Sequence, residues 1–383
     1  MKKFIVSATI PASLGFFAGL YTKLKEDYEV CVVSSPGDRL DQIASNESIR
    51  KHAIPMKRDI SLIKDIVSFI RFIGFFLTEK PYVVHGNTPK ASLLSMMAAK
   101  LTRVPHRIYM CHGLRYQGCT GFKRRLLMNM ERISCACATE VICVSDGVKD
   151  VLETDGICNQ GKTMVVRYGS ANGINVNRYD PEKIDTTQVK ETYRLKEDDY
   201  VVSFVGRIVK DKGVEELVDA FIKLKQKKIP IKLLLIGGRE ANLNPISQRT
   251  EDIIAKESEI IETGQQKDIR PFVKASKLLV LPSYREGFGL VLIEAGAMGV
   301  PVVSSDIIGC NNVVIPEING LFCQPRSVDS LVEALERMYY DKELYTKIAS
   351  QTRQSIINRF EQETVQAAYV EHYKKLLTEG VKI

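Results

Sequence analysis

The feature that most constrains the fold of this chain is an alternation of short apolar runs with longer amphipathic segments. In residues 1–180 the strand-like runs are Lys3–Ala8, Val30–Ser34, Tyr82–His85, Arg107–Cys111, Val141–Val144 and Met164–Val166. The helix-like segments between them are Leu14–Glu26, Ser61–Thr78, Pro89–Thr102, Phe122–Cys135 and Gly147–Thr154. Several runs are apolar at consecutive positions, which is typical of strands that are buried on both faces. The alternation predicts a parallel, doubly wound α/β sheet.

The same alternation restarts after a polar stretch, Asp180–Asp199. The second set of strand-like runs is Tyr200–Val205, Lys232–Ile236, Leu278–Leu281, Pro301–Ser304 and Leu321–Cys323. A chain of 383 residues fits two domains of ~180 residues each. We predict an N-terminal Rossmann-like domain at 1–178, a C-terminal Rossmann-like domain at 179–357, and a final helix at 358–383 that crosses back to the first domain. The two domains are expected to face each other across a cleft, where such sheets bind ligands.

Composition excludes several other classes of protein. Charged residues make up 26% and hydrophobic residues 45% of the chain, an ordinary globular composition. The nine cysteines are an odd number without a zinc-binding or disulfide spacing, so we expect reduced cysteines in a cytosol. The most apolar segment, Ile60–Thr78, is interrupted by charges and is not a spanning helix. The N-terminus resembles a signal peptide, but Pro11 and Gly15 interrupt its apolar run, and a buried first strand explains the run equally well.

The first of three candidate ligand loops follows the first strand and contains Gly15 and Gly19. A loop without Cβ atoms lets backbone N–H groups approach a diphosphate at a helix N-terminus. The loop is not a G-x-G-x-x-G motif, so the fingerprint of a dehydrogenase is absent. A plain turn between strand and helix explains this loop as well as a phosphate site does.

The second loop follows the first strand of the second half. Arg207, Lys210 and Lys212 lie between that strand and Gly213, just before a predicted helix. Cations beside a helix N-terminus form an anion site, in which arginine offers a fork to phosphate oxygens and lysine a point charge. We favour phosphate binding over the alternative, a basic surface loop without a ligand.

The third and strongest motif is Pro282–Glu294. Glu286 and Glu294 lie on one face of a helix if Glu286 is its cap. Glycines at 287 and 289 expose backbone N–H groups between the two carboxylates. The carboxylates can bind the hydroxyl groups of two sugars while the N–H groups hold a diphosphate, a layout that matches a nucleotide sugar. The alternative is two unrelated surface glutamates.

Two of these motifs resemble those of the retaining glycosyltransferases of family four, which have the GT-B architecture. They are G-R-x-x-x-x-K-G at Gly206–Gly213 and E-G-F-G-x-x-x-x-E at Glu286–Glu294. Further matches along nearly the whole chain are Val144–Asp146, Gly169–Asn175, Gly299–Asp306 and Asn319–Phe322. Several matches in order are more specific than any one of them. The resemblance implies sugar transfer from a nucleotide-sugar co-substrate, with retention and with neither a metal ion nor another cofactor.

The resemblance also implies roles for individual side chains. Arg207 and Lys212 would bind the donor diphosphate and stabilise the departing nucleotide. Glu286 would bind hydroxyl groups of the transferred sugar, and Glu294 would bind the ribose. His112, which follows a predicted strand, would contact the donor sugar. We therefore expect His112, Glu286, Arg207 and Lys212 to form the catalytic set.

Backbone groups complete the donor site that the resemblance implies. The N–H groups of Phe288, Gly289 and Leu290 would hold phosphate oxygens, with Gly287 in the same loop. Gly15 would let the N-terminal loop approach the diphosphate.

Two further stretches indicate the acceptor. Cys111–Gly118 and Gly237–Glu240 resemble bacterial members that extend lipid-diphosphate-linked sugars in capsule, O-antigen or protein-glycan assembly. The expected reaction is transfer from a UDP-sugar to a polyprenyl-diphosphate-linked glycan. Ile308–Asn312 lacks an acidic residue that the family often has, which leaves the donor sugar open. Two alternatives remain: the same fold acting on a soluble acceptor, and a sugar-nucleotide-binding protein without catalysis.

The excess positive charge lies in the first half of the chain. The net charge is +8, whereas residues 1–180 alone carry +9. In the predicted helix 121–133, Lys123, Arg124 and Arg125 flank an apolar stripe, so this helix can lie in the headgroup region of an anionic membrane. Ile60–Phe76 can do the same, and the alternative for each is a core-facing helix with a solvated rim.

These features predict a cytoplasmic protein that is peripherally associated with the inner face of the plasma membrane. Nucleic acid is a less suitable partner, because the chain has no Trp and lacks the aromatic–basic interleaving of an RNA-binding sheet.

Overall fold

The computed structural model describes residues 1–240 and 244–378, and its contacts divide the chain into two compact units. The N-terminal unit comprises Met1–Gly173 and the segment from Glu363 onward, and the C-terminal unit comprises Ile174–Gln362. The predicted boundaries, after residues 178 and 357, differ from these by a few residues. The end of the predicted final helix, 379–383, lies outside the described residues.

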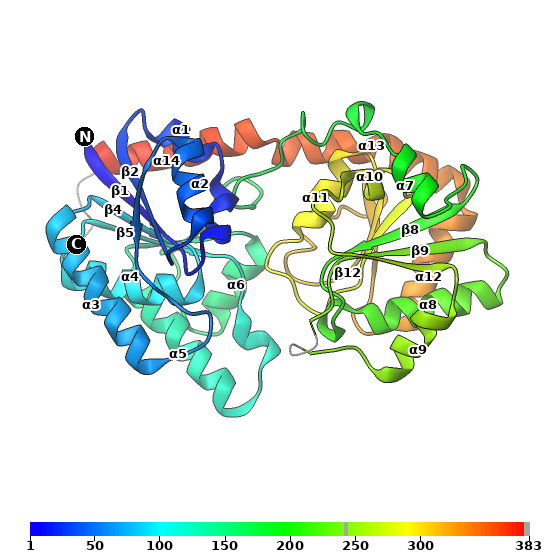
Figure 1. Cartoon of the computed structure of the whole chain (residues 1–383), viewed down its shortest axis with the longest axis horizontal. Helices are drawn as coiled ribbons and strands as arrows, with labels where there is room; N and C mark the ends of the chain where they lie inside the picture. The colour runs from blue at the N-terminus through cyan, green and yellow to red at the C-terminus, as the bar shows by residue number, and fades with distance from the viewer. Residues whose placement is uncertain (241–243, 379–383) are drawn as a thin grey trace. The chain divides into compact units, whose positions relative to one another are not determined.

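The N-terminal unit contains a seven-stranded sheet whose neighbouring strands are all parallel, in the order β3-β2-β1-β4-β5-β6-β7 (Figure 1). Its strands are β1 Lys2–Ser7, β2 Tyr28–Ser34, β3 Arg50–Ala53, β4 Val83–Gly86, β5 His106–Cys111, β6 Glu140–Cys143 and β7 Thr163–Val165. Its α-helices are α1 Leu20–Leu24, α2 Asp38–Glu47, α3 Leu62–Glu79, α4 Pro89–Leu101, α5 Gly121–Cys137, α6 Asp146–Thr154 and α14 Gln362–Thr378. Two 3-10 helices are η1 Pro11–Phe17 and η2 Arg115–Gly118. This strand order confirms the doubly wound fold.

The C-terminal unit repeats that order in a six-stranded parallel sheet, β10-β9-β8-β11-β12-β13. Its strands are β8 Tyr200–Val205, β9 Ile231–Ile236, β10 Ile260–Gly264, β11 Leu278–Leu281, β12 Val302–Ser305 and β13 Gly320–Cys323. Its α-helices are α7 Thr187–Thr192, α8 Val214–Gln226, α9 Gln248–Lys256, α10 Arg270–Lys274, α11 Leu290–Ala297, α12 Val328–Tyr340 and α13 Lys342–Phe360. Two 3-10 helices are η3 Pro181–Lys183 and η4 Lys210–Lys212. The second half is therefore a second Rossmann-like domain.

The two strands that were not predicted, β3 and β10, lie at the edges of the two sheets. Every residue of β3 is exposed, and most of β10 is only partly buried. A central strand such as β11 is buried throughout. Because an edge strand has a neighbour on one side only, it needs no continuous apolar run, and the run is the signal by which the other strands were recognised.

Two predicted helices are divided in the structure. The segment Leu14–Glu26 forms the end of η1 and then α1, because Gly19 between them has a φ of 82°, a left-handed conformation that glycine adopts without strain. The predicted final helix at 358–383 is divided at Glu361, whose ψ of 129° is extended, so that its first residues belong to α13 and α14 begins at Gln362. The segment after β1 is therefore a 3-10 helix followed by a short α-helix, and not one continuous helix.

The last helix, α14, packs on the sheet of the N-terminal unit. The hydroxyl of Tyr28 on β2 donates to the carbonyl of Tyr373 over 2.6 Å. The hydroxyl of Tyr369 donates to the carbonyl of Ser170 over 2.9 Å. These buried tyrosines join the end of the chain to the first unit. No helix within residues 1–240 and 244–378 has the length and apolar character of a membrane span.

Candidate active site

Two loops of the C-terminal unit meet at the carboxyl ends of the neighbouring strands β8 and β11. The first is Gly206–Gly213, and the second begins at Pro282. At Gly213 φ is +70°, and a Cβ there would lie 2.0 Å from the carbonyl oxygen of Pro282. The N–H of Tyr284 donates to the carbonyl of Asp211 over 3.0 Å. Only glycine permits this approach, so Gly213 allows the two motifs to form one site.

The joined loops bring Lys212 and Glu286 together. The Nζ of Lys212 lies 2.5 Å from Oε1 of Glu286, and the two side chains are 20% and 14% exposed. The sequence placed both residues in a donor site but did not predict that they pair, since they are 74 positions apart. Partial burial reduces screening by water, so the attraction between the two charges fixes the positions of a cation and a carboxylate at this edge of the sheet.

Arg207 forms a second, more open pair. Its guanidinium lies 2.9 Å from a carboxylate oxygen of Glu240, and both side chains are more than 40% exposed. Such exposed pairs contribute little to stability, so the guanidinium can exchange Glu240 for a phosphate. Glu240 belongs to a family-like stretch but had not been linked to Arg207. Among the residues that the structure describes, no group of three or more His, Cys, Asp or Glu side chains could hold a metal ion.

Glu286 is not the cap of a helix, which corrects one expectation. Helix α11 begins at Leu290 with Gly289 as its N-cap, so Glu286 lies in the preceding loop, where Lys212 holds it. Glu294 lies inside α11. The two glutamates therefore do not share a helix face, because the glycine-containing segment between them delays the start of the helix.

Glu294 is partly buried and has a specific partner. The hydroxyl of Tyr179 donates to its Oε1 over 2.7 Å. Burial raises the pKa of Glu294 above the usual value. Tyr179 belongs to no motif, since it lies in the segment between the two halves, and nothing in the local sequence marked it as a site residue.

Two of the three backbone N–H groups expected to hold phosphate, those of Gly289 and Leu290, donate to backbone carbonyls. The N–H of Gly289 donates to the carbonyl of Gly309 over 3.3 Å. The N–H of Leu290 donates to the carbonyl of Phe288 over 2.8 Å, and Gly287 lies in the same loop. Binding of phosphate by Gly289 and Leu290 would therefore require them to leave these carbonyls.

The N-terminal unit has a separate candidate half-site at the carboxyl ends of β1, β4 and β5, which are neighbours in the sheet. Gly15 lies in η1 after β1, Asn87 follows β4, and His112 follows β5. Asn87 Oδ1 and His112 Nε2 are buried and have no hydrogen-bond partner in the described part of the chain. Burial lowers the pKa of His112 to about 4. Unpaired buried polar atoms are uncommon in native proteins, so this edge is suited to a polar ligand.

Asn87 was not predicted, although a polar residue directly after a buried strand is a signal that could have identified it.

The three predicted membrane cations lie near the start of α5. Lys123, Arg124 and Arg125 are exposed, beside Phe122, which is 81% exposed. The guanidinium of Arg124 lies 3.8 Å from Asp155. This end of α5 thus combines exposed positive charge with an exposed ring, as an interfacial helix does.

Sequence comparisons match each half of the chain to a family. Residues 19–177 match Glycosyltransferase Family 4, and residues 185–355 match Glycosyl transferases group 1. The capsular polysaccharide biosynthesis glycosyltransferase CapM of Staphylococcus aureus is 34% identical over 98% of this chain and 96% of its own. The UDP-Gal:alpha-D-GlcNAc-diphosphoundecaprenol alpha-1,3-galactosyltransferase of Escherichia coli is 28% identical over 86% of this chain and 84% of its own.

Solved structures share the fold over both units. A glycosyltransferase from Rickettsia africae has a TM-score of 0.81 at 20% identity, covering 99% of this chain and 100% of its own. HepE from Anabaena, in complex with UDP, has a TM-score of 0.79 at 19% identity, covering 98% of this chain and 100% of its own.

Proposed function

Because this chain belongs to glycosyltransferase family 4 and has its GT-B fold, we propose that it transfers a sugar from a UDP-sugar to a polyprenyl-diphosphate-linked glycan during assembly of a bacterial capsular polysaccharide. The Escherichia coli relative is named for a UDP-galactose donor and a diphosphoundecaprenol-linked acceptor. The fold relative HepE is in complex with UDP. In this chain, the observation that carries the proposal is the Lys212–Glu286 pair between two joined loops.

The donor is bound by charges that are already in place. Lys212 and Arg207 neutralise the diphosphate and stabilise the negative charge that develops on the departing UDP. Glu286 accepts hydrogen bonds from hydroxyl groups of the transferred sugar, and Glu294 accepts them from the ribose. The partly buried contacts hold Lys212, Glu286 and Glu294 in position before the donor binds. Arg207, in its exposed pair, exchanges Glu240 for phosphate.

The proposed reaction retains the configuration of the transferred sugar. The acceptor hydroxyl attacks the anomeric carbon on the face from which UDP leaves, so the new glycosidic bond forms as the bond to phosphate breaks. The proton of that hydroxyl passes to the departing phosphate oxygen. Arg207 and Lys212 supply the positive charge that this reaction needs, so it is proposed to proceed without a metal ion.

The acceptor lipid places the reaction at the cytoplasmic face of the plasma membrane. We propose that the exposed cations Lys123, Arg124 and Arg125 at the start of α5 bind anionic headgroups there.

A thermal-shift panel with UDP, GDP, ADP, CMP and NAD tests the donor first. A ligand at 100 times its dissociation constant stabilises the folded state by about 2.7 kcal/mol, a readily measured shift. We expect a shift with UDP and release of UDP from a UDP-sugar only when a polyprenyl-diphosphate glycan is added. A UDP shift without turnover on any acceptor would identify a non-catalytic binder. Equal turnover on a soluble glycan without the lipid would identify the soluble-acceptor enzyme.

A further inference from the structure

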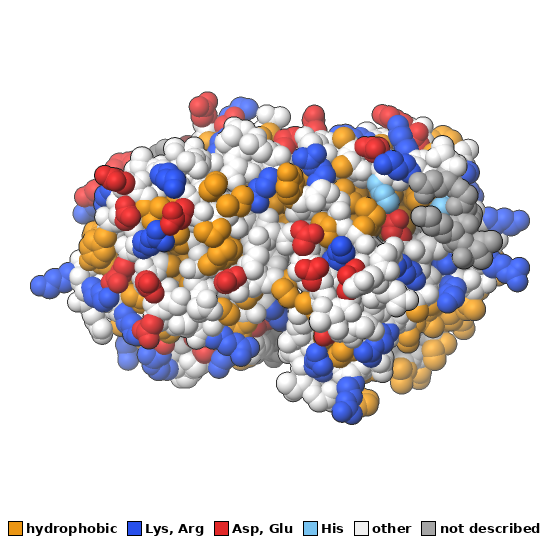
Figure 2. Space-filling view, turned by 180° about the vertical axis from the view of Figure 1, so that it is seen from behind, with side chains coloured by type: hydrophobic (Ala, Val, Ile, Leu, Met, Phe, Trp, Pro, Cys, Tyr) orange, Lys and Arg blue, Asp and Glu red, His pale blue; other side chains and the backbone are white. Residues whose placement is uncertain are grey.

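Helix α3 is apolar on two faces, and only one of them is buried. Phe72, Phe75 and Phe76 pack into the unit. The outer face carries Leu62, Ile63, Ile66, Val67 and Ile70, whose exposed fractions range from 44% to 79%. These positions form one stripe at helical spacing. Figure 2 shows hydrophobic atoms gathered at the lower right, where α3 lies in that view. A contiguous exposed apolar patch of this kind marks an interaction surface.

Exposed cations accompany the apolar stripe. Lys57 and Arg58 precede the helix, and Lys64 and Arg71 lie on it. Close contact with Lys57 lowers the pKa of Lys64, as expected where two like charges lie together. The helix thus presents apolar side chains between positive charges.

Carboxylates on the same segment are largely engaged elsewhere. Asp65 lies 2.8 Å from the ammonium of Lys90, and Glu79 lies 2.8 Å from that of Lys3. Asp59 is exposed near the start of the helix. The four exposed cations of the stripe therefore outnumber the carboxylates that can offset them.

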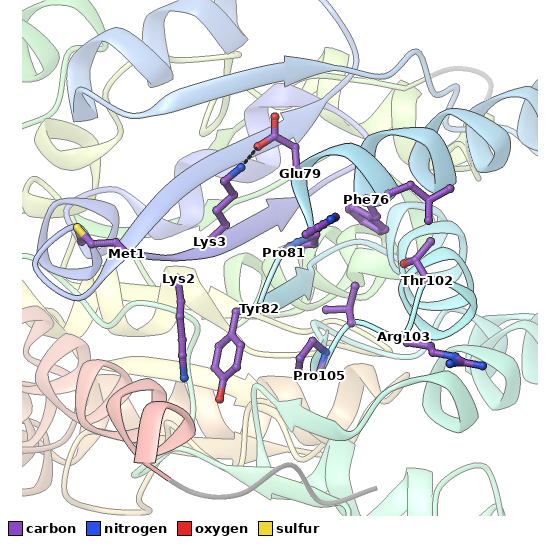
Figure 3. A pocket seen from close by; sticks show the side chains of 13 residues that line it. Met1, Lys2, Lys3, Phe76, Glu79, Pro81, Tyr82, Thr102, Arg103 and Pro105 are labelled. Atoms are coloured by element: carbon purple, nitrogen blue, oxygen red, sulfur yellow. Dashed lines mark hydrogen bonds and ion pairs between the residues drawn. The ribbon is translucent and has the colours of Figure 1, made fainter.

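Positive charge continues at the C-terminal end of the stripe. A pocket of about 510 Å³ lies there, and its lining includes Leu77, Lys80 and Arg103. Figure 3 shows Arg103 pointing outward from the pocket, and Lys2 beside the Tyr82 ring, whose centroid is 3.6 Å from the ammonium. Leu77 is 59% exposed, so apolar and cationic side chains also alternate at this end of α3.

We infer that the outer face of α3 docks on an anionic lipid bilayer, with its apolar stripe at the boundary between headgroups and acyl chains and its flanking cations among the headgroups. The inference rests on the proposed lipid-linked acceptor, and it adds an apolar contact to the electrostatic contact proposed for α5. Helix α4 contacts both α3 and α5 and is buried between them, so both surfaces belong to one side of this unit (Figure 1).

Charge complementarity favours a bilayer over a second copy of the chain. In a symmetric dimer through this face, Lys64 and Arg71 would approach the same cations of the other copy, and this repulsion would oppose the apolar contact. Anionic headgroups neutralise these cations while the acyl chains cover the stripe.

Co-sedimentation with vesicles tests the inference. The variant I63Q/I66Q/I70Q changes three exposed side chains, so its melting temperature should stay close to that of the unmodified protein. We expect its partitioning onto vesicles of phosphatidylcholine and phosphatidylglycerol to fall by more than tenfold. The matched control Y340Q changes a residue that is 60% exposed on α12 and should partition normally. Unmodified protein should bind vesicles of phosphatidylcholine alone much more weakly.

The outcomes separate this inference from the proposed function. Unchanged partitioning of I63Q/I66Q/I70Q would overturn the docking role of α3, whatever the activity. A second outcome would also overturn the docking role of α3: the unmodified protein forms dimers and fails to bind vesicles, and the variant I63Q/I66Q/I70Q is monomeric. Lost vesicle binding with normal turnover on a short-chain, water-soluble acceptor analogue would support both proposals. Vesicle binding that depends on α3, without turnover of any UDP-sugar, would support the docking surface and reject the transferase proposal.

Discussion

The hydroxyl of Tyr179 donates a hydrogen bond to Oε1 of Glu294 over 2.7 Å, although the two residues are 115 positions apart. Tyr179 lies in the segment that joins the two halves of the sequence, and Glu294 lies in α11 of the donor motif. Burial raises the pKa of the Glu294 carboxyl, and this hydrogen bond opposes the rise because it stabilises the charged form.

Y179F should weaken UDP binding in a pH-dependent way. Without the tyrosine hydroxyl, the pKa of Glu294 rises further, so the carboxylate that is proposed to accept ribose hydroxyls becomes protonated at a higher pH. We expect UDP affinity to fall about three- to tenfold near neutral pH, the effect of losing roughly 1 kcal/mol, and to fall further as the pH is lowered. Calorimetric titration between pH 6 and pH 8 measures this. If the UDP affinities of Y179F and of the unmodified protein change with pH in the same way, the role of Tyr179 is contradicted.

K212A should lower turnover by more than about tenfold, because it removes a charge that stabilises the departing UDP and leaves Glu286 unpaired. The matched control is K210A, in the same loop. The side chain of Lys210 is 51% exposed, and its ammonium lies 3.4 Å from Glu215. It should retain most of the activity. Steady-state kinetics with a UDP-sugar distinguish the two variants. Similar losses of turnover in both would mean that the loop contributes positive charge without a specific role for Lys212.

G213A should destabilise the C-terminal unit and disrupt the donor site, because a Cβ at this position would lie 2.0 Å from the carbonyl oxygen of Pro282. The control is G299A, where φ is +75° but a Cβ would meet nothing within 4 Å. Both variants lose about 1–2 kcal/mol from the left-handed conformation. G213A should lose roughly 1–3 kcal/mol more through the clash. Thermal unfolding compares them, and equal losses would show that the loops do not depend on this contact.

Protonation of His112 should reduce stability at mildly acidic pH. Burial lowers its pKa to about 4, whereas an exposed histidine in the unfolded chain titrates near 6.5. Between these values the unfolded state binds the proton and the folded state does not, so the free energy of unfolding falls as the pH falls from about 6.5 to 4. For His112 alone, the free energy of unfolding at pH 5 should be about 2 kcal/mol lower than at pH 7.

Urea unfolding of the unmodified protein and of H112Q at pH 7 and pH 5 measures this loss. H112Q should show a shallower pH dependence, and an identical slope in the two proteins would show that His112 titrates normally. His85, whose pKa is lowered to about 3 by burial and by the nearby His112, remains in both proteins.

Local patterns in the sequence were sufficient for much of the fold. Strands such as Leu278–Leu281 are apolar at consecutive positions because parallel strands are covered on both faces, and that pattern survives in a short window. The motifs around Lys212 and Glu286 were also recognisable in a short window, because each motif lies in a single loop that follows a single strand. The edge strand Arg50–Ala53 was not recognisable, because exposed strands carry no such pattern.

The sequence by itself determined most of the strands and helices, the presence of two doubly wound domains, and which loops carry charge. Only the tertiary structure decided that Lys212 pairs with Glu286 and Tyr179 with Glu294, because contacts between residues 74 and 115 positions apart depend on which strands are neighbours. It also decided which face of α3 is exposed. That helix is apolar around much of its circumference, and periodicity cannot show which side the rest of the protein covers until the helix is packed.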